Sequence, residues 1–177
     1  MKKLLSLTGV LMLTAVAAFA GDGKTFDKKV VIPVDDCKFR ANEWQVDLAA
    51  VGAFAHGVRP GWGGGIGVNY FFTKFVGLGV EQDVWGRKGQ SAPTWATIGN
   101  LFVRYPICSI NLAPYAMVGG GTYYGKGQKG HGLGHVGGGL EYRFTDNVGL
   151  FTDARFVFSS EDPKTGVIGR TGVRLAF

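Results

Sequence analysis

The sequence has 177 residues, a formal net charge of +6 at pH 7, 30 glycines and 13% aromatic residues. A charge this small, spread along the whole chain, argues against a nucleic-acid-binding protein. The length suits a single domain, and abundant glycine together with many aromatic residues is more typical of glycine-kinked strands than of helices.

The first 20 residues have the pattern of a cleaved secretory signal peptide. A basic start, Lys2-Lys3, precedes an apolar run that ends in the small-x-small sequence Ala18-Phe19-Ala20. The run is too short for a transmembrane helix, so we predict that residues 1–20 are removed. Removal takes the basic count from 19 to 17 against 13 acidic residues, a net charge of +4.

Residues 21–41 are charged and lack periodicity, and we predict a leader segment there, with a short added strand as the alternative. The folded domain is predicted at 42–177. Apolar and polar residues alternate there in runs of about ten, the length that a tilted strand needs to cross the hydrocarbon of a membrane. We predict eight strands, at 43–54, 62–72, 75–85, 95–105, 112–124, 133–144, 148–158 and 167–177. Their connections are three short turns (73–74, 106–111, 145–147) and four longer loops (55–61, 86–94, 125–132, 159–166).

Eight strands that each have one apolar face predict an all-β fold, an eight-stranded antiparallel up-and-down transmembrane β-barrel. The first and last strands must pair, because lipid does not tolerate an open edge. A soluble barrel such as a lipocalin, with the two faces reversed, is the alternative. Two groups of aromatic residues favour the membrane, because they are placed like interfacial girdles. One group lies near the turns (Tyr70, Phe72, Phe75, Tyr105, Tyr142, Phe144, Phe177) and the other near the loops (Trp62, Trp85, Trp95, Tyr123, Phe158).

Ten charged residues within the predicted strands share the face opposite the apolar one. They are five acids and five arginines: Asp47, Glu81, Asp83, Glu141 and Asp153, with Arg104, Arg143, Arg155, Arg170 and Arg174. All 11 lysines lie outside the predicted strands. Arginine suits a buried pair because its planar fork binds a carboxylate at two points and keeps its charge. An eight-stranded barrel is narrow enough for side chains to fill it. We therefore predict a lumen plugged by ion pairs.

The last strand carries Val173, Leu175 and Phe177 on its apolar face and ends on that phenylalanine. With the signal peptide, two Phe-Thr-x-x-Val-Gly-Leu hairpins and the stretch Asn100-Leu-x-x-Arg-Tyr-Pro106, this resembles the small Gram-negative outer-membrane β-barrel proteins of the OmpA/OmpX-like group. The resemblance implies localisation in the cell outer membrane, contact with outer-membrane lipid and lipopolysaccharide, and a monomer. It also implies that Val173, Leu175 and Phe177 are the signal read by the barrel-assembly machinery.

In such a barrel the short turns and both chain ends face the periplasm, so that 21–41 is a periplasmic leader. Cys37 in the leader and Cys108 in the second turn then share an oxidising compartment, and we predict a disulfide between them. Two unrelated free thiols are the alternative.

The sequence offers little support for chemistry. His131 and His135 lack a nearby serine for acyl transfer and a third ligand for a metal. We predict no catalytic residues, metal or cofactor, and no nucleic-acid partner. The expected function is that of an integral outer-membrane barrel with a filled lumen and a structural or surface-interaction role. A small-solute pore and, less favoured, a lipid-modifying enzyme are the alternatives.

Overall fold

The alternation in the sequence produces eight antiparallel strands in the structure, a computed structural model that describes residues 37–55, 58–89, 91–125, 130–159 and 166–177. The strands are β1 (Glu43–Ala55), β2 (Val58–Phe71), β3 (Val76–Arg87), β4 (Thr94–Arg104), β5 (Leu112–Tyr124), β6 (His131–Arg143), β7 (Val148–Ser159) and β8 (Gly166–Ala176). The predicted signal peptide and most of the predicted leader lie outside the described residues. No helix in the described ranges is long and apolar enough to cross a membrane.

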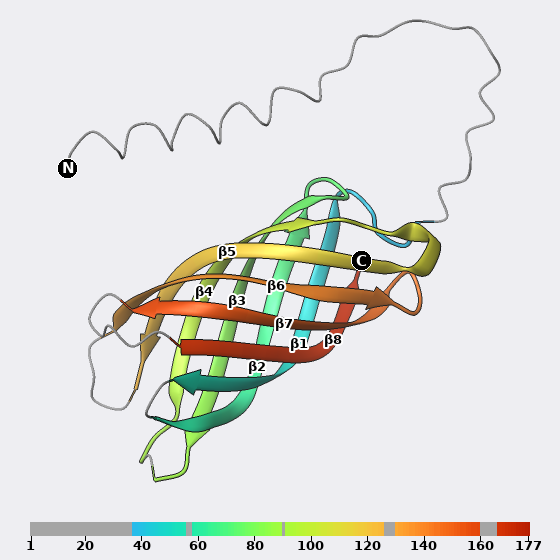
Figure 1. Ribbon diagram of the computed structural model, residues 1–177. Coiled ribbons are helices and arrows are strands. Elements are labelled where there is room, and N and C mark those ends of the chain that lie inside the picture. Colours follow the sequence, from blue (N-terminus) through green and yellow to red (C-terminus); the bar gives the residue numbers. More distant parts are fainter. Residues whose placement is uncertain (1–36, 56–57, 90, 126–129, 160–165) are drawn as a thin grey trace, which may run out of the picture. The chain divides into compact units, whose positions relative to one another are not determined.

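The strands follow one another in chain order around a closed barrel, and β1 pairs with β8 (Figure 1). The predicted fold class is confirmed. At the seam Asp47 lies opposite Arg174, and the backbone N–H of Phe177 donates to the carbonyl oxygen of Trp44 at 2.9 Å. Each strand therefore has a partner on both sides, and no edge is left to pair with another chain.

The two ends of the barrel differ in their connections. We call the end with segments 72–75, 105–111 and 144–147 the turn end, and the opposite end the loop end. In the segment after β4, a short 3-10 helix (Cys108–Ile110) is followed by Asn111, which has a φ of 55°. Asparagine tolerates this left-handed conformation better than most residues, and it allows the chain to turn into β5.

Strands reach further at the loop end than the sequence predicted. The predicted loop 55–61 is wrong, because β1 continues to Ala55 and β2 already begins at Val58. The glycine and proline content suggested a loop. Pro60 instead lies within β2, beside a register irregularity of the β1–β2 pairing between Ala53 and Ala55, where a strand tolerates proline. His131, predicted to lie in a loop, is the first residue of β6. The connections at the loop end are therefore not consistently longer than those at the turn end.

Side chains alternate between the outside of the barrel and its lumen, as the sequence predicted. The exposed face is a belt of large apolar residues, among them Leu48, Ile66, Val80, Val118 and Phe156. The aromatic group near the turns is also on the outside, with Phe72, Phe75, Tyr105, Phe144 and Phe177 exposed.

The aromatic group near the loops is only partly on the outside. Trp62, Trp95 and Phe158 are exposed, but Trp85 is buried and Tyr123 packs against the buried apolar cluster of the lumen. Trp85 has the same parity on its strand as Glu81 and Asp83, so the alternation itself places it inside. The prediction that Trp85 and Tyr123 belong to an interfacial girdle is wrong.

Glycines make room in the lumen for the large polar side chains. The register places Gly65 opposite Asp83 and Gly139 opposite Asp153 on the neighbouring strand. A Cβ at Gly65 would lie 1.9 Å from Oδ1 of Asp83. These glycines therefore let acidic side chains of the next strand lie across the backbone, and the barrel interior fills without clashes.

Candidate functional site

The lumen at the turn end is filled by a network of three acids and three arginines: Glu43, Asp47 and Glu141 with Arg104, Arg143 and Arg174. Glu43 on β1 is bound by two arginines from the opposite side of the barrel. Its Oε1 accepts from Nη1 of Arg104 at 3.2 Å and from Nη2 of Arg143 at 2.8 Å. All three side chains are fully buried. We call this set the turn-end network.

Glu141 on β6 connects the remaining members of the turn-end network. It forms a short ion pair with Arg143, accepts from Nη1 of Arg174 at 2.7 Å and lies 3.7 Å from Nη1 of Arg104. Arg174 also binds Asp47 across the β1–β8 seam with two parallel bonds, Nε to Oδ1 at 2.6 Å and Nη2 to Oδ2 at 2.7 Å. This bidentate geometry is the strong form of an arginine–carboxylate pair.

A second set, the central network, lies next along the lumen and consists of Glu81, Asp83, Asp153, Arg155 and Arg170. Glu81 on β3 forms short ion pairs with both arginines. Nη2 of Arg155 donates to Oδ1 of Asp153 at 3.1 Å, and Asp83 lies 3.7 Å from Nε of Arg170. The structure thus brings together all ten lumen residues that the sequence predicted.

Aromatic rings complete the packing around the arginines. The guanidinium carbon of Arg104 lies 3.7 Å from the centre of the Phe71 ring, and that of Arg174 lies 4.7 Å from the Phe151 ring. Guanidinium groups are weakly hydrated and stack favourably on ring faces, so the rings offset part of the desolvation cost of the buried charges.

Sequence reasoning missed Glu43, although the signal was present. Glu43 is the first residue of β1 and has the same parity as Asp47, which the sequence placed on the inward face. With Glu43 the turn-end and central networks together contain six acids and five arginines. Gln45, which is fully buried, donates from Nε2 to Oε1 of Glu43 at 2.6 Å and supports the acid from its own strand.

The chain before β1 closes the turn end of the lumen. A disulfide joins Cys37 to Cys108, the pair that the sequence predicted. Phe39 is fully buried, and the centre of its ring lies 5.2 Å from the guanidinium carbons of both Arg104 and Arg143. Lys38 adds a hydrogen bond from Nζ to the carbonyl oxygen of Phe144 at 2.8 Å. The described part of the predicted leader is therefore a plug over the turn-end network.

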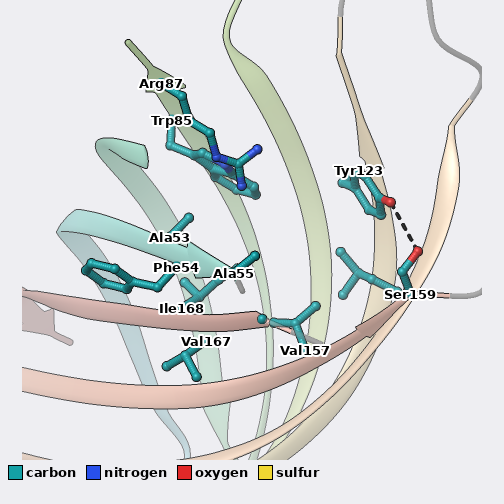
Figure 2. A pocket seen from close by; sticks show the side chains of 12 residues that line it. Ala53, Phe54, Ala55, Trp85, Arg87, Tyr123, Val157, Ser159, Val167 and Ile168 are labelled. Atoms are coloured by element: carbon teal, nitrogen blue, oxygen red, sulfur yellow. Dashed lines mark hydrogen bonds between the residues drawn. The ribbon is translucent and has the colours of Figure 1, made fainter. Parts of the chain in front are cut away.

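Toward the loop end, the lumen changes from charged to apolar. The buried cluster there consists of Val51, Ala53, Trp85, Ala96, Ile98, Leu133 and Ile168. Beyond it lies an open pocket of about 200 Å³, which Figure 2 shows with Trp85 and Arg87 on one side and Tyr123 and Ser159 on the other. The prediction of an ion-paired lumen did not include this apolar part.

The two histidines among the described residues, His131 and His135, occupy different places. His135 is buried in the lumen, and His131 stacks on Tyr123 with ring centres 5.4 Å apart. Neither faces the outside of the barrel, where a lipid substrate would lie. Among the residues that the structure describes, no group of three or more histidine, cysteine or acidic side chains is arranged as a metal site.

No protein-family model matches the chain, and no curated protein matches it in sequence. Solved structures do match. The crystal structure of Neisserial surface protein A superposes with a TM-score of 0.63 at 16% identity, over 76% of this chain and 96% of that chain. The N-terminal β-barrel domain of Pseudomonas aeruginosa OprF gives 0.59 at 19% identity, over 78% and 99%.

The outer membrane protein OprG of Pseudomonas aeruginosa superposes with a TM-score of 0.58 at 10% identity, over 80% of this chain and 99% of that chain. Identities this low describe the fold and carry no functional detail. The matches nevertheless agree with the closed eight-stranded topology and with the resemblance in the sequence. The chain therefore has the fold of the small outer-membrane β-barrel proteins.

Proposed function

We propose that this chain is an integral protein of the Gram-negative outer membrane, with a lumen closed to solutes and a structural or surface-interaction role. The observation that carries the proposal is the burial of the two ion-pair networks across the lumen. Glu43, Glu141, Arg104 and Arg143 have fully buried side chains, so water does not reach them along the barrel axis. A barrel of eight strands has no room for a channel beside such side chains.

The outward face supports the membrane location. Large apolar side chains such as Leu48, Ile66, Val80 and Phe156 are exposed around the barrel, and a soluble protein would leave this surface in water at a large cost. Outer-membrane lipid and lipopolysaccharide are the partners that this belt fits. Because each strand is paired on both sides, the barrel needs no second copy, and we propose a monomer.

We further propose that the turn end faces the periplasm and the loop end faces the exterior. Support comes from the two chain ends, which face the periplasm in the barrels that the sequence resembles. The Cys37–Cys108 disulfide holds the segment before β1 at the turn end, and Phe177 lies at the same end beside Trp44. In this orientation the plug with Phe39 closes the periplasmic side. The interaction surface, where there is one, is then the loop end.

Planar-bilayer recording of the refolded mature chain tests the closed lumen. We expect no stable large channels, because ion pairs hold Glu43 on β1 across the lumen to Arg104 on β4 and Arg143 on β6. A porin recorded in the same bilayer checks that insertion is detected. Stable openings of the folded protein, confirmed as heat-modifiable on a gel, would favour the small-solute pore instead.

Phe177→Ala tests the proposed assembly signal. The side chain of Phe177 is 65% exposed, while its backbone N–H and C=O bond to Trp44. The substitution keeps the backbone hydrogen bonds. We therefore expect the free energy of unfolding in detergent to stay within about 0.5 kcal/mol of that of the unmodified chain. In a Gram-negative host we expect the level of folded protein in the outer membrane to fall several-fold.

Phe144→Ala is the matched control, because Phe144 is also an exposed aromatic residue at the turn end. It should leave the amount in the outer membrane nearly unchanged. Equal losses for Phe144→Ala and Phe177→Ala would assign the effect to membrane anchoring and reject a terminal assembly signal.

A further inference from the structure

The lumen changes character at one level on several strands. On each of five strands, a polar inward residue is followed by an apolar one at the next inward position toward the loop end. The pairs are Asp83 and Trp85, Asn100 and Ile98, His135 and Leu133, Arg155 and Val157, and Arg170 and Ile168. A plug alone does not require this change, because ion pairs already close the lumen below. The loop-end part is therefore a distinct apolar compartment with a polar floor beneath it.

This compartment opens into the loop-end pocket. Its walls come from β1, β3, β5, β6, β7 and β8, with Ala53, Trp85, Tyr123, Leu133, Val157 and Ile168 as the main apolar surfaces. An apolar protein cavity of about 150 Å³ is known to hold benzene. The pocket, at about 200 Å³, has room for one aromatic ring or a short alkyl chain with a small polar group.

Two hydrogen-bond donors at this pocket have no partner within the described residues. They are Nε1 of Trp85 and Nε of Arg87, both buried. The residues are two positions apart on β3 and lie on the same side of the pocket in Figure 2. A buried tryptophan N–H usually has a partner, and a buried guanidinium nitrogen without one is costly. Both nitrogens are closed off from solvent, but the two Nη atoms of Arg87 are not among these closed donors and can meet the two oxygens of a carboxylate.

Arg87 also differs from the arginines deeper in the lumen. Arg104, Arg143, Arg155, Arg170 and Arg174 each bind at least one carboxylate. In the part of the chain that the structure describes, no acidic side chain is paired with Arg87. Tyr123 and Ser159 face it from the opposite wall, with their hydroxyl oxygens 3.1 Å apart, and add polar groups to the rim. Within the described residues, the positive charge at the mouth therefore has no acidic partner.

We propose that the loop-end pocket binds a small monocarboxylate with an apolar body. The ring or alkyl chain lies between Trp85, Leu133 and Ile168, and the carboxylate accepts from the Nη atoms of Arg87. The ion-pair networks below stop the ligand from passing through, so this is a binding site and not a channel. Binding itself does not depend on the proposed membrane orientation; only its access from the exterior rests on that proposal.

Quenching of Trp85 fluorescence tests the site in the folded mature chain in lipid nanodiscs. The other three tryptophans face outward, so Trp44, Trp62 and Trp95 are replaced by phenylalanine. The probe is 4-bromobenzoate, whose heavy atom quenches a neighbouring indole, and 4-bromobenzyl alcohol is its uncharged counterpart. We expect saturable quenching by 4-bromobenzoate. Quenching that only rises linearly with concentration would overturn the proposal.

Two substitutions locate the binding. Ala53→Phe fills the pocket from β1 and should abolish saturable quenching, whereas Ala50→Phe, on the outward face of the same strand, should not. Arg87→Gln should raise the Kd of 4-bromobenzoate about tenfold or more, the usual effect of losing a charge-assisted bond, and leave that of the alcohol unchanged. Heat-modifiable gel migration confirms that each variant is folded. Saturable binding that survives Ala53→Phe in folded protein would place the ligand elsewhere, and equal effects of Arg87→Gln on both probes would reject carboxylate recognition.

Discussion

Replacing Glu141 by glutamine is expected to lower the free energy of unfolding by about 3–5 kcal/mol, the usual cost of removing one member of a buried ion pair. Glu141 is fully buried and contacts Arg104, Arg143 and Arg174. Glutamine keeps the shape of the side chain but not its charge. Its NH2 group is a donor and therefore faces arginines that need acceptors. Urea unfolding of the barrel in lipid vesicles, followed by tryptophan fluorescence, measures the change.

Asp146→Asn is the matched control, because it also removes one negative charge near the turn end. Asp146 is exposed between β6 and β7, and its contact with Arg143 is made by the backbone carbonyl, which the substitution keeps. The expected change is within about 0.5 kcal/mol. Similar losses for the two variants would show that net charge, and not the buried network, controls stability.

The network also predicts a non-additive pair. If Glu141→Gln destabilises by leaving arginine charge without a partner, then removing Arg174 as well should cost less than the sum of the two single changes. The double variant should still be less stable than the unmodified chain, because Asp47 loses its bidentate partner Arg174 across the β1–β8 seam. The turn-end network therefore also joins the first and last strands of the barrel.

Alternation made most of this fold predictable, because a period of two settles which residues face the lumen. It placed all ten charged residues inside, and it would have placed Glu43 there too, since Glu43 shares the parity of Gln45. Glu43 was the first residue of the predicted strand 43–54, and it was left out of the set of inward charges. Trp85 was misplaced for a different reason: an aromatic residue next to a loop was treated as a girdle residue against its own parity.

The position of a residue along the barrel axis was harder to predict from the sequence than the side of the sheet that it faces. Strand tilt and register decide that Asp83 lies with Arg155 and Arg170 while Trp85 belongs to the apolar compartment. These depend on pairings between strands far apart in sequence, which one sequence does not reveal. Composition was also misleading at the loop end. Pro60 and Gly61 suggested a loop, but β2 already begins at Val58, and Val58 and Gly61 pair with β1.

Removing the disulfide by Cys37→Ala with Cys108→Ala is expected to lower the free energy of unfolding by about 2–4 kcal/mol. The bond closes a segment of 71 residues, and loop-closure entropy alone would give about 4 kcal/mol for a loop of that length. Part of this is recovered, because the segment before β1 gains freedom in the folded state once it is untethered. Phe39 and its contacts with Arg104 and Arg143 still hold the plug, so the barrel itself should remain closed.

Reductant separates the effect of the bond from that of the alanine side chains. The unmodified chain unfolded in urea with dithiothreitol should match the double variant, and the double variant should not respond to dithiothreitol. Phe39→Ala in the oxidised chain isolates the plug from the tether: it removes a fully buried ring, at an expected cost of about 3–5 kcal/mol if the cavity cannot collapse. Unchanged unfolding midpoints with and without reductant would mean that the tether contributes nothing, and that packing of Phe39 over the turn-end network is sufficient to close this end of the barrel.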